Sequence, residues 1–121
     1  MIELAIQQAR KSTHTKARVG AVIFHKKTVL AAAYNKPFAL SKRLAPQFHS
    51  KLRVGIHAEA AAILGARTDL RGAEMLVVRI GRSGALRMSK PCPWCWAYCQ
   101  YVGIKSVTFS DESGGFTTMR I

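Results

Sequence analysis

Two short motifs decide how this chain is expected to fold: residues 57–59 read His57-Ala58-Glu59, and residues 91–95 read Pro91-Cys92-Pro93-Trp94-Cys95. Each motif stands at the start of an expected helix. An Ala-rich run follows His57 as far as residue 66, and Pro93 suits the first turn of a helix over 93–102. The motifs therefore place an imidazole, a carboxylate and two thiols at the starts of two helices.

The other segments alternate between helical and extended patterns. Residues 2–12 carry apolar side chains at helical spacing, whereas 18–25 and 28–34 are the β-branched, apolar arms of a hairpin. The apolar run 75–80 indicates an interior strand, and further strands are expected over 104–109 and from Phe116 onward. This order predicts a three-layer α/β/α domain with a mixed sheet over residues 1–121. A parallel return after Phe109 needs about a dozen residues, so the last strand is expected to be antiparallel or rudimentary.

The polar residues of the two motifs suit a catalytic zinc site. Catalytic zinc usually takes three protein ligands and leaves one position for water. His57, Cys92 and Cys95 supply such a set, and the two cysteines share one helix face near an N-terminus that favours thiolate. Glu59, in the first helical turn, is expected to carry protons between water and substrate. Taken alone, it would be an ordinary acidic residue at a helix N-terminus.

Net charge is the unusual part of the composition. Nineteen Lys and Arg residues against six Asp and Glu residues give a net charge of +13. Such a charge attracts phosphates, and this interpretation is preferred over the alternative of a bias toward solubility. The basic residues are spread along the chain and form no tail. We therefore expect a phosphate-bearing substrate, with single-stranded nucleic acid as an alternative partner.

Cysteine usage and hydropathy predict an intracellular protein. Hydrophobic residues make up 49% of the 121 residues, enough for one core. The sequence has no apolar run of about 18 residues, so we expect no membrane span. Residues 1–8 do not read as a signal peptide. Three cysteines, two of them in Cys-x-x-Cys, indicate metal or reduced thiols rather than disulfides. We expect a cytoplasmic location.

With its motifs in this order, the chain resembles the cytidine deaminase-like superfamily, which includes cytidine, deoxycytidylate and tRNA adenosine deaminases. The resemblance covers nearly the whole chain. It implies that His57, Cys92 and Cys95 bind Zn²⁺, that Glu59 is the proton shuttle, and that the protein forms homo-oligomers. It further implies substrate contacts from Asn35, which follows the hairpin, and from Val19, Gly20 and Ala21, which line the base pocket. Pro91 and Trp94, which belong to the metal motif itself, are expected at the border of this pocket.

The substrate is less sharply indicated than the reaction. His-Ala-Glu is the form found in deoxycytidylate, tRNA-adenosine and polynucleotide branches, whereas the short segment after Phe109 is more like the end of free-nucleoside deaminases. The expected function is hydrolytic deamination of a cytosine-containing nucleotide or nucleoside to its uracil form, with release of ammonia. The alternatives are a deaminase acting on single-stranded DNA or RNA, including tRNA, and a catalytically silent, zinc-stabilised nucleic-acid-binding module.

Two further regions carry expectations. Cys99, one turn after Cys95, is expected to be a buried small hydrophobe rather than a fourth ligand. The segment 35–55 lacks periodicity and mixes aromatic with basic side chains. It suits a lid that stacks on bases and binds phosphate, with a solvated basic loop as an equal alternative. The residues concerned are Phe38, Phe48, His49, Lys42, Arg43, Lys51 and Arg53.

Overall fold

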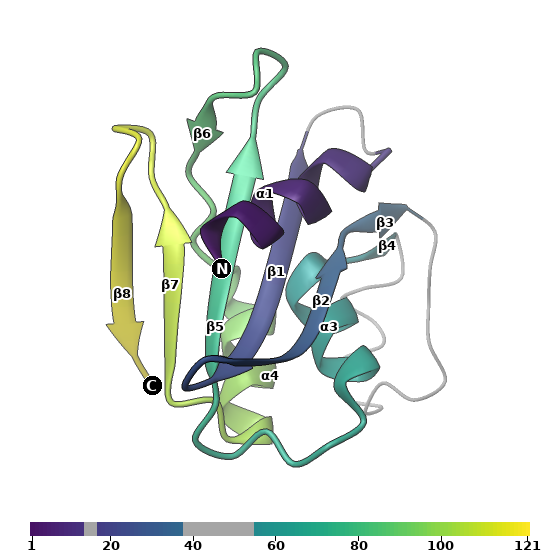
Figure 1. Cartoon of the computed structure of the whole chain (residues 1–121), viewed down its shortest axis with the longest axis vertical. Coiled ribbons are helices and arrows are strands. Elements are labelled where there is room, and N and C mark those ends of the chain that lie inside the picture. The colour runs from purple at the N-terminus through teal and green to yellow at the C-terminus, as the bar shows by residue number, and fades with distance from the viewer. Residues whose placement is uncertain (14–16, 38–54) are drawn as a thin grey trace.

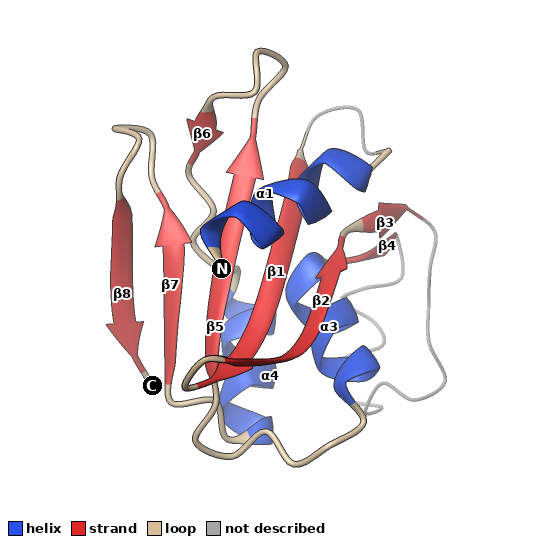
Figure 2. Ribbon diagram, in the orientation of Figure 1, coloured by secondary structure: helices blue, strands red, loops and turns tan. Residues whose placement is uncertain are grey.

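A computed structural model describes residues 1–13, 17–37 and 55–121. Its centre is a six-stranded sheet in which five strands follow the order β2-β1-β5-β7-β8 and β6 pairs with β5. Helix α1 lies over one face of this sheet, and α3 and α4 lie over the other (Figure 1, Figure 2). The predicted α/β/α arrangement with a mixed sheet is therefore confirmed. The aromatic and basic residues of the expected lid lie outside the described residues.

The long elements follow the sequence pattern closely. The helices are α1 (Ile2–Lys11), α3 (Ala58–Ala66) and α4 (Pro93–Val102). The long strands are β1 (Arg18–His25), β2 (Thr28–Tyr34), β5 (Glu74–Ile80), β7 (Ser106–Ser110) and β8 (Phe116–Arg120). The sequence placed the start of β7 two residues too early, because Gly103 in the left-handed region first ends α4.

Three strands of two residues each were not predicted. They are β3 (Lys36–Pro37), β4 (Gly55–Ile56) and β6 (Leu86–Arg87). Because β3 and β4 pair with each other, the two ends of the segment 35–55 are strand and not loop. Segments this short have no periodicity of their own, and only their partner strands define them.

Strand directions follow from the connections. Among the described strands, β5 and β7 are the parallel pair, and α4 lies in the crossover between them. The turn between β7 and β8 is too short for a second crossover, and β8 is antiparallel to β7 as expected. Both α3 and α4 therefore run against β5 and β7, which brings their N-termini to the carboxyl end of these strands.

Alternate residues of the central strands face opposite helices. The larger hydrophobic cluster, on the side of α3 and α4, includes Ala21, Ile23, Met75, Val77 and Cys99. The smaller cluster, under α1, includes Ala5, Ala9, Val22, Leu76 and Val78. The sheet is thus buried on both faces at β1 and β5.

Gly20 lets α1 pack directly on the backbone of β1. A Cβ atom at Gly20 would overlap the Ala5 carbonyl oxygen and would lie 2.6 Å from the Ala9 nitrogen. Both alanines are fully buried on the same side of α1. A glycine at this strand position is therefore a packing requirement.

Among the described residues, none of the helices is long and apolar enough to cross a membrane.

Candidate active site

His57 and Cys92 occupy the same position in two different helices. Each is the N-cap residue, with an extended backbone, of α3 and α4 respectively, and neither side chain caps its own helix. Cys95 follows on the first turn of α4. The crossover topology brings these residues together at the carboxyl end of β5 and β7, where open α/β sheets generally bind their ligands.

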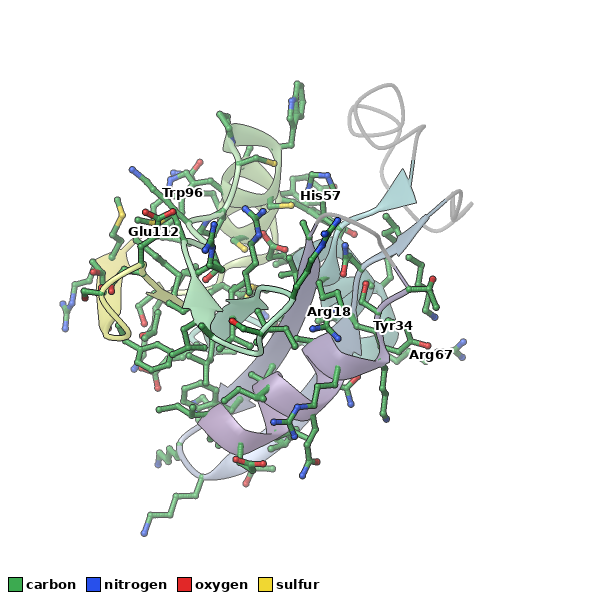
Figure 3. All side chains as sticks on the ribbon, turned by 90° about the horizontal axis from the view of Figure 1, so that it is seen from above. Arg18, Tyr34, His57, Arg67, Trp96 and Glu112 are labelled. Atoms are coloured by element: carbon green, nitrogen blue, oxygen red, sulfur yellow. The ribbon has the colours of Figure 1, made fainter. Side chains whose placement is uncertain are left out.

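Three potential ligand atoms converge at this point. His57 Nδ1 lies 3.3 Å from Cys95 Sγ and 3.6 Å from Cys92 Sγ, and all three atoms lie within 4.8 Å of one another. In a tetrahedral zinc site with bonds of about 2.0–2.3 Å, neighbouring ligand atoms are about 3.5 Å apart. The donor set therefore fits one such ion, with Nδ1 as the coordinating nitrogen. Seen from above in Figure 3, His57 lies near the middle of the molecule.

The protonation of the metal-free ligands is unequal. The hydrogen bond from the Cys95 thiol, aided by the His57 ring, lowers the pKa of Cys92 to about 4. The same hydrogen bond, together with burial, raises the pKa of Cys95. A hydrogen bond to Cys92 raises the pKa of His57 against the opposing effect of burial. Without metal, the thiolate form of Cys92 is thus stabilised by its contacts with Cys95 and His57. A metal ion must displace the proton of the Cys95 thiol to bind both sulfurs as thiolates.

Glu59 adjoins the ligand group without belonging to it. It is the second residue of α3 and is only 5% exposed. Burial raises the pKa of its carboxyl group, while a hydrogen bond with the Cys95 thiol acts in the opposite direction. A buried carboxyl group with a raised pKa beside a metal-binding group is suited to accept and return protons.

Asn35 fastens the end of β2 to the start of β1. Its side-chain oxygen accepts a hydrogen bond from the Val19 N–H at 2.9 Å, and its Nδ2 donates to the Ala17 carbonyl oxygen at 2.7 Å. The Ser12 hydroxyl donates to the main-chain oxygen of Asn35 at 3.1 Å. An amide has one more N–H and one more lone pair than these bonds use. The contact of Asn35 with a substrate stays a prediction.

The other predicted substrate contacts divide between the two sheet faces. Val19 and Ala21 belong to the face of α3 and α4, the side of the metal ligands. Gly20 packs against α1, on the opposite face, and its contact with a substrate stays a prediction. Pro91 is buried, and Trp94 is half-buried against the larger hydrophobic cluster. Whether they border a substrate stays a prediction.

Two buried serines, which the sequence analysis missed, hold the segment that leads to Cys92. The hydroxyl oxygens of Ser89 and Ser110 are 2.8 Å apart, and Ser89 Oγ lies 3.0 Å from the Val77 carbonyl oxygen. The Ser110 N–H donates to Ser89 Oγ at 2.8 Å. These bonds tie β5, β7 and the start of α4 together. The only sequence signal was Ser110 at the end of a largely apolar stretch, which is weak on its own.

Cys99 is not part of the ligand group. It is fully buried, and its Sγ lies 3.9 Å from the sulfur of Met75. The prediction of a buried small hydrophobe is therefore confirmed. On the same helix Tyr98 is buried, whereas Tyr101 is 65% exposed.

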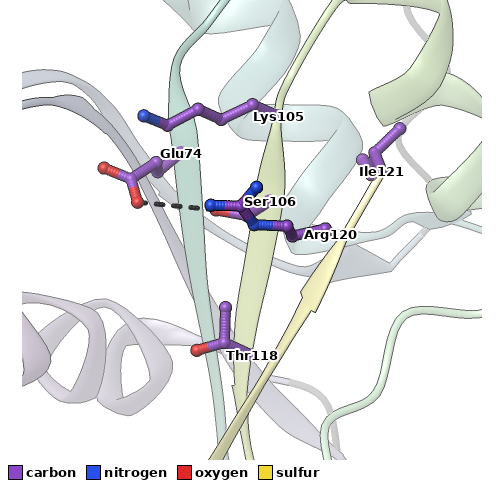
Figure 4. Close-up of a pocket in the computed structure, with 6 residues that line it drawn as sticks. All are labelled: Glu74, Lys105, Ser106, Thr118, Arg120 and Ile121. Carbon is purple, nitrogen blue, oxygen red and sulfur yellow. Dashed lines mark hydrogen bonds between the residues drawn. The ribbon is translucent and has the colours of Figure 1, made fainter.

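A hollow of about 480 Å³ lies at the opposite end of the sheet (Figure 4). Glu74 and Ser106, the first residues of β5 and β7, line it, and the Ser106 hydroxyl donates to Glu74 at 3.4 Å. Its other lining residues are Lys105, Thr118, Arg120 and Ile121. Since the metal ligands lie at the carboxyl ends of these strands, this hollow is separate from the candidate site.

Solved structures of similar fold include a dCMP deaminase and a cytidine deaminase. The fold is similar to dCMP deaminase from the cyanophage S-TIM5 in apo form, with a TM-score of 0.64, 20% identity, and coverage of 89% of this chain and 77% of that one. For the same phage enzyme in complex with dCMP and dUMP, the TM-score is 0.61 and the identity is 18%, with coverage of 89% of this chain and 76% of that one. For cytidine deaminase from Burkholderia pseudomallei, the TM-score is 0.66 and the identity is 16%, with coverage of 98% of this chain and 88% of that one. At these identities the likeness shows the fold alone.

The family is shown by sequence. No curated protein matches the chain significantly. Residues 1–111, however, match the family model described as "Cytidine and deoxycytidylate deaminase zinc-binding region". This match includes His57, Glu59, Cys92 and Cys95, the residues that the fold brings together at the carboxyl end of β5 and β7. The chain belongs to the cytidine and deoxycytidylate deaminase family.

Proposed function

We propose that the protein is a zinc-dependent hydrolytic deaminase of a cytosine-containing nucleotide or nucleoside. The observation that carries this proposal is the convergence of His57, Cys92 and Cys95 beside the buried carboxyl group of Glu59. Family membership supports the same reaction. Among proteins of similar fold, the phage dCMP deaminase binds dCMP and dUMP, which supports a nucleotide as the first choice.

The ligand set suits zinc in charge as well as in spacing. Two cysteines bind as thiolates, and their two negative charges balance the two positive charges of the ion. When bound, zinc supplies Lewis acidity that lowers the pKa of a water molecule and makes it nucleophilic near neutral pH. His57, as the N-cap of α3, orients its Nδ1 toward the two sulfurs through the start of a well-packed helix.

Glu59 is the proton carrier in this proposal. Its carboxylate accepts a proton from the attacking water and returns protons to the ring nitrogen and to the departing amino group. One C–O bond forms at C4 of the base, one C–N bond breaks, and ammonia leaves. Burial of Glu59 keeps bulk water from competing for these protons.

A deaminase acting on single-stranded nucleic acid is the second candidate. The net charge of +13 favours it, since such a surface attracts polyanions. Affinity for a cytosine-containing oligonucleotide that falls steeply with salt would support it. For either substrate we infer a single domain over residues 1–121 that associates with further copies of itself.

Ammonia release from a substrate panel tests the proposed function. The panel holds cytidine, deoxycytidine, their mono- and triphosphates, the adenosine counterparts and single-stranded oligonucleotides. We expect zinc-loaded protein to release ammonia from cytosine compounds, and chelator-treated protein to lose this activity until zinc is restored. Zinc-loaded protein that releases no ammonia from any of them would overturn the proposal and favour the catalytically silent binding module.

A further inference from the structure

Positive charge gathers at the carboxyl end of β5, and no acidic residue accompanies it in sequence. From Met75 to Ser110 the chain has no Asp or Glu, yet four basic residues precede Cys92 in this stretch: Arg79, Arg82, Arg87 and Lys90. The Nη2 of Arg18, at the start of the neighbouring strand β1, donates to the Gly81 carbonyl oxygen at 2.9 Å. The segment of chain from the end of β5 to Cys92 is therefore positively charged.

Arg79 and Arg87 lie on the same face of the sheet as the metal ligands. Met75 and Val77 face α3 and α4, and strand alternation places Arg79 next on that face. Arg87 is the direct partner of Arg79 across β5 and β6, so the two share a face. A Cβ atom at Gly81 would lie 3.5 Å from Cγ and Cδ of Arg87. The aliphatic part of Arg87 therefore extends along this face past Gly81.

The contact between Cys99 and Met75 shows where Arg79 lies, along the direction of β5, relative to the metal ligands. The two sulfurs are 3.9 Å apart, and α4 runs antiparallel to β5. From Cys99 back to Cys92 the helix rises about 10 Å, at about 1.5 Å per residue. From Met75 to Arg79 the strand rises about 13 Å, at about 3.3 Å per residue. Arg79 therefore lies just beyond the level of Cys92, toward the open edge of the sheet.

The backbone at both arginines is held by one buried hydroxyl. Ser110 Oγ accepts the Arg79 N–H at 3.1 Å and lies 2.8 Å from the Arg87 carbonyl oxygen. Ser110 is fully buried and also contacts Ser89, which precedes Cys92 by three positions. Arg79 is half-buried with a covered Nε, while Arg87 is exposed. The two guanidinium groups thus stand on a backbone whose position is fixed relative to the metal ligands.

We propose that Arg79 and Arg87 form a phosphate subsite for a substrate whose base lies at His57, Cys92 and Cys95. The sugar of a nucleotide separates its phosphate from its base, so a phosphate subsite must lie beyond the ligands, as these arginines do. Guanidinium groups bind phosphate through paired, charge-assisted N–H donors. The subsite selects phosphate-bearing cytosine compounds over free nucleosides. The proposal rests on the proposed function and gives it a substrate class.

Kinetics of Arg87→Gln test the subsite, because Arg87 is exposed and its neutralisation leaves the core intact. The substrates are deoxycytidylate, deoxycytidine and a single-stranded oligonucleotide with one cytosine. We expect the ratio of kcat/KM for a phosphate-bearing substrate over deoxycytidine to fall about 10-fold to 100-fold. Arg87→Lys keeps the charge without the paired donors and should lower the ratio less. Arg120→Gln removes the same charge at the opposite end of the sheet and should leave the ratio unchanged.

The two phosphate sources give different results. A loss on deoxycytidylate identifies the phosphate monoester of a free nucleotide, and a loss confined to the oligonucleotide identifies a phosphodiester. A ratio that is the same in Arg87→Gln and in the unsubstituted protein overturns the subsite.

Binding separates this inference from the proposed function. Calorimetry with deoxycytidylate and with the oligonucleotide uses zinc-loaded Glu59→Gln protein, with and without Arg87→Gln, so that no turnover occurs. Weaker binding of a phosphate-bearing ligand in the double variant supports the subsite even if the unsubstituted protein releases no ammonia, which overturns only the deaminase. Equal binding by both proteins, or binding by neither, overturns the subsite.

Discussion

His57 Nδ1 and Cys95 Sγ lie 3.3 Å apart although 38 positions separate them in the sequence. No local interaction accounts for this. The parallel pairing of β5 with β7 forces α4 to run back along the sheet, and α3 runs in the same direction before β5. The N-termini of both helices therefore meet at one edge, and the N-cap positions supply two of the three ligands.

This geometry predicts a difference between two cysteines of the same helix. Cys95→Ala should remove a ligand and reduce bound zinc from about one ion per chain to near zero, since catalytic zinc needs its three protein ligands. Cys99→Ala should retain zinc, because Cys99 packs on Met75 and lies outside the ligand group. Elemental analysis of the purified proteins measures this. Equal zinc loss in both variants would contradict the assigned ligand set.

The catalytic role of Glu59 should be separable from zinc binding. Glu59→Gln removes the proton carrier while keeping the size of the side chain, so we expect full zinc occupancy and a fall in kcat of about 10²- to 10⁴-fold. Metal analysis and ammonia release on the same preparation provide the comparison. A variant with full zinc and unreduced turnover would show that another group moves the protons.

The buried carboxyl group of Glu59 also predicts how the stability of the metal-free protein depends on pH. Burial raises the pKa of Glu59 above its ordinary value of 4.5, so above that pH the folded state binds more protons than the unfolded state. This contribution to the free energy of unfolding therefore decreases as pH rises from about 4.5 toward the raised pKa. Glu59→Gln lacks the effect.

Urea unfolding of chelator-treated protein at several pH values tests this expectation. The free energy of unfolding of Glu59→Gln minus that of the unsubstituted protein should grow as the pH rises. Taking the difference should cancel most of the opposite contribution of Cys92, because the causes of its lowered pKa are Cys95 and His57 and not Glu59. A constant difference would mean that the carboxyl group is not desolvated in the folded state.

The sequence was sufficient to predict those features of the fold and the site that arise from interactions between neighbouring residues. Pro93 at the start of α4 and the Ala-rich run after His57 marked two helices, and with them the ligand positions. The sheet face on which Gly20 lies was not predictable. Because β1 is apolar on both faces, its sequence shows no alternation of polar and apolar residues that would tell one face from the other. Ser89 and Ser110 escaped notice because their roles arise only when β5 and β7 become neighbours.

The serine pair should matter for stability more than its residue types suggest. Ser110→Ala removes the buried hydroxyl that accepts the Arg79 N–H and donates to the Arg87 carbonyl oxygen, and it should lower the free energy of unfolding by about 1–3 kcal/mol. The matched control is Thr118→Ala, which breaks the exposed hydroxyl contact of 2.7 Å to Thr108. It should change stability by less than about 0.5 kcal/mol. Denaturant titration of both variants decides, and equal losses would contradict a special role for the buried pair.

Replacing glycine by alanine should lower the stability of the protein at Gly20 and raise it at Gly65. Gly20→Ala adds a methyl group that overlaps the Ala5 carbonyl oxygen, so α1 must move, at a cost of about 1–3 kcal/mol or more. Gly65 is an exposed residue of α3 with nothing within 4 Å of an added Cβ, and Gly65→Ala should stabilise by about 0.5 kcal/mol through helix propensity. Thermal unfolding of both variants measures the pair. Because Gly20 faces α1 and not the metal ligands, zinc-loaded Gly20→Ala that remains folded should keep most of its activity. A Gly20→Ala protein of unchanged stability that loses turnover would instead place Gly20 in the substrate pocket.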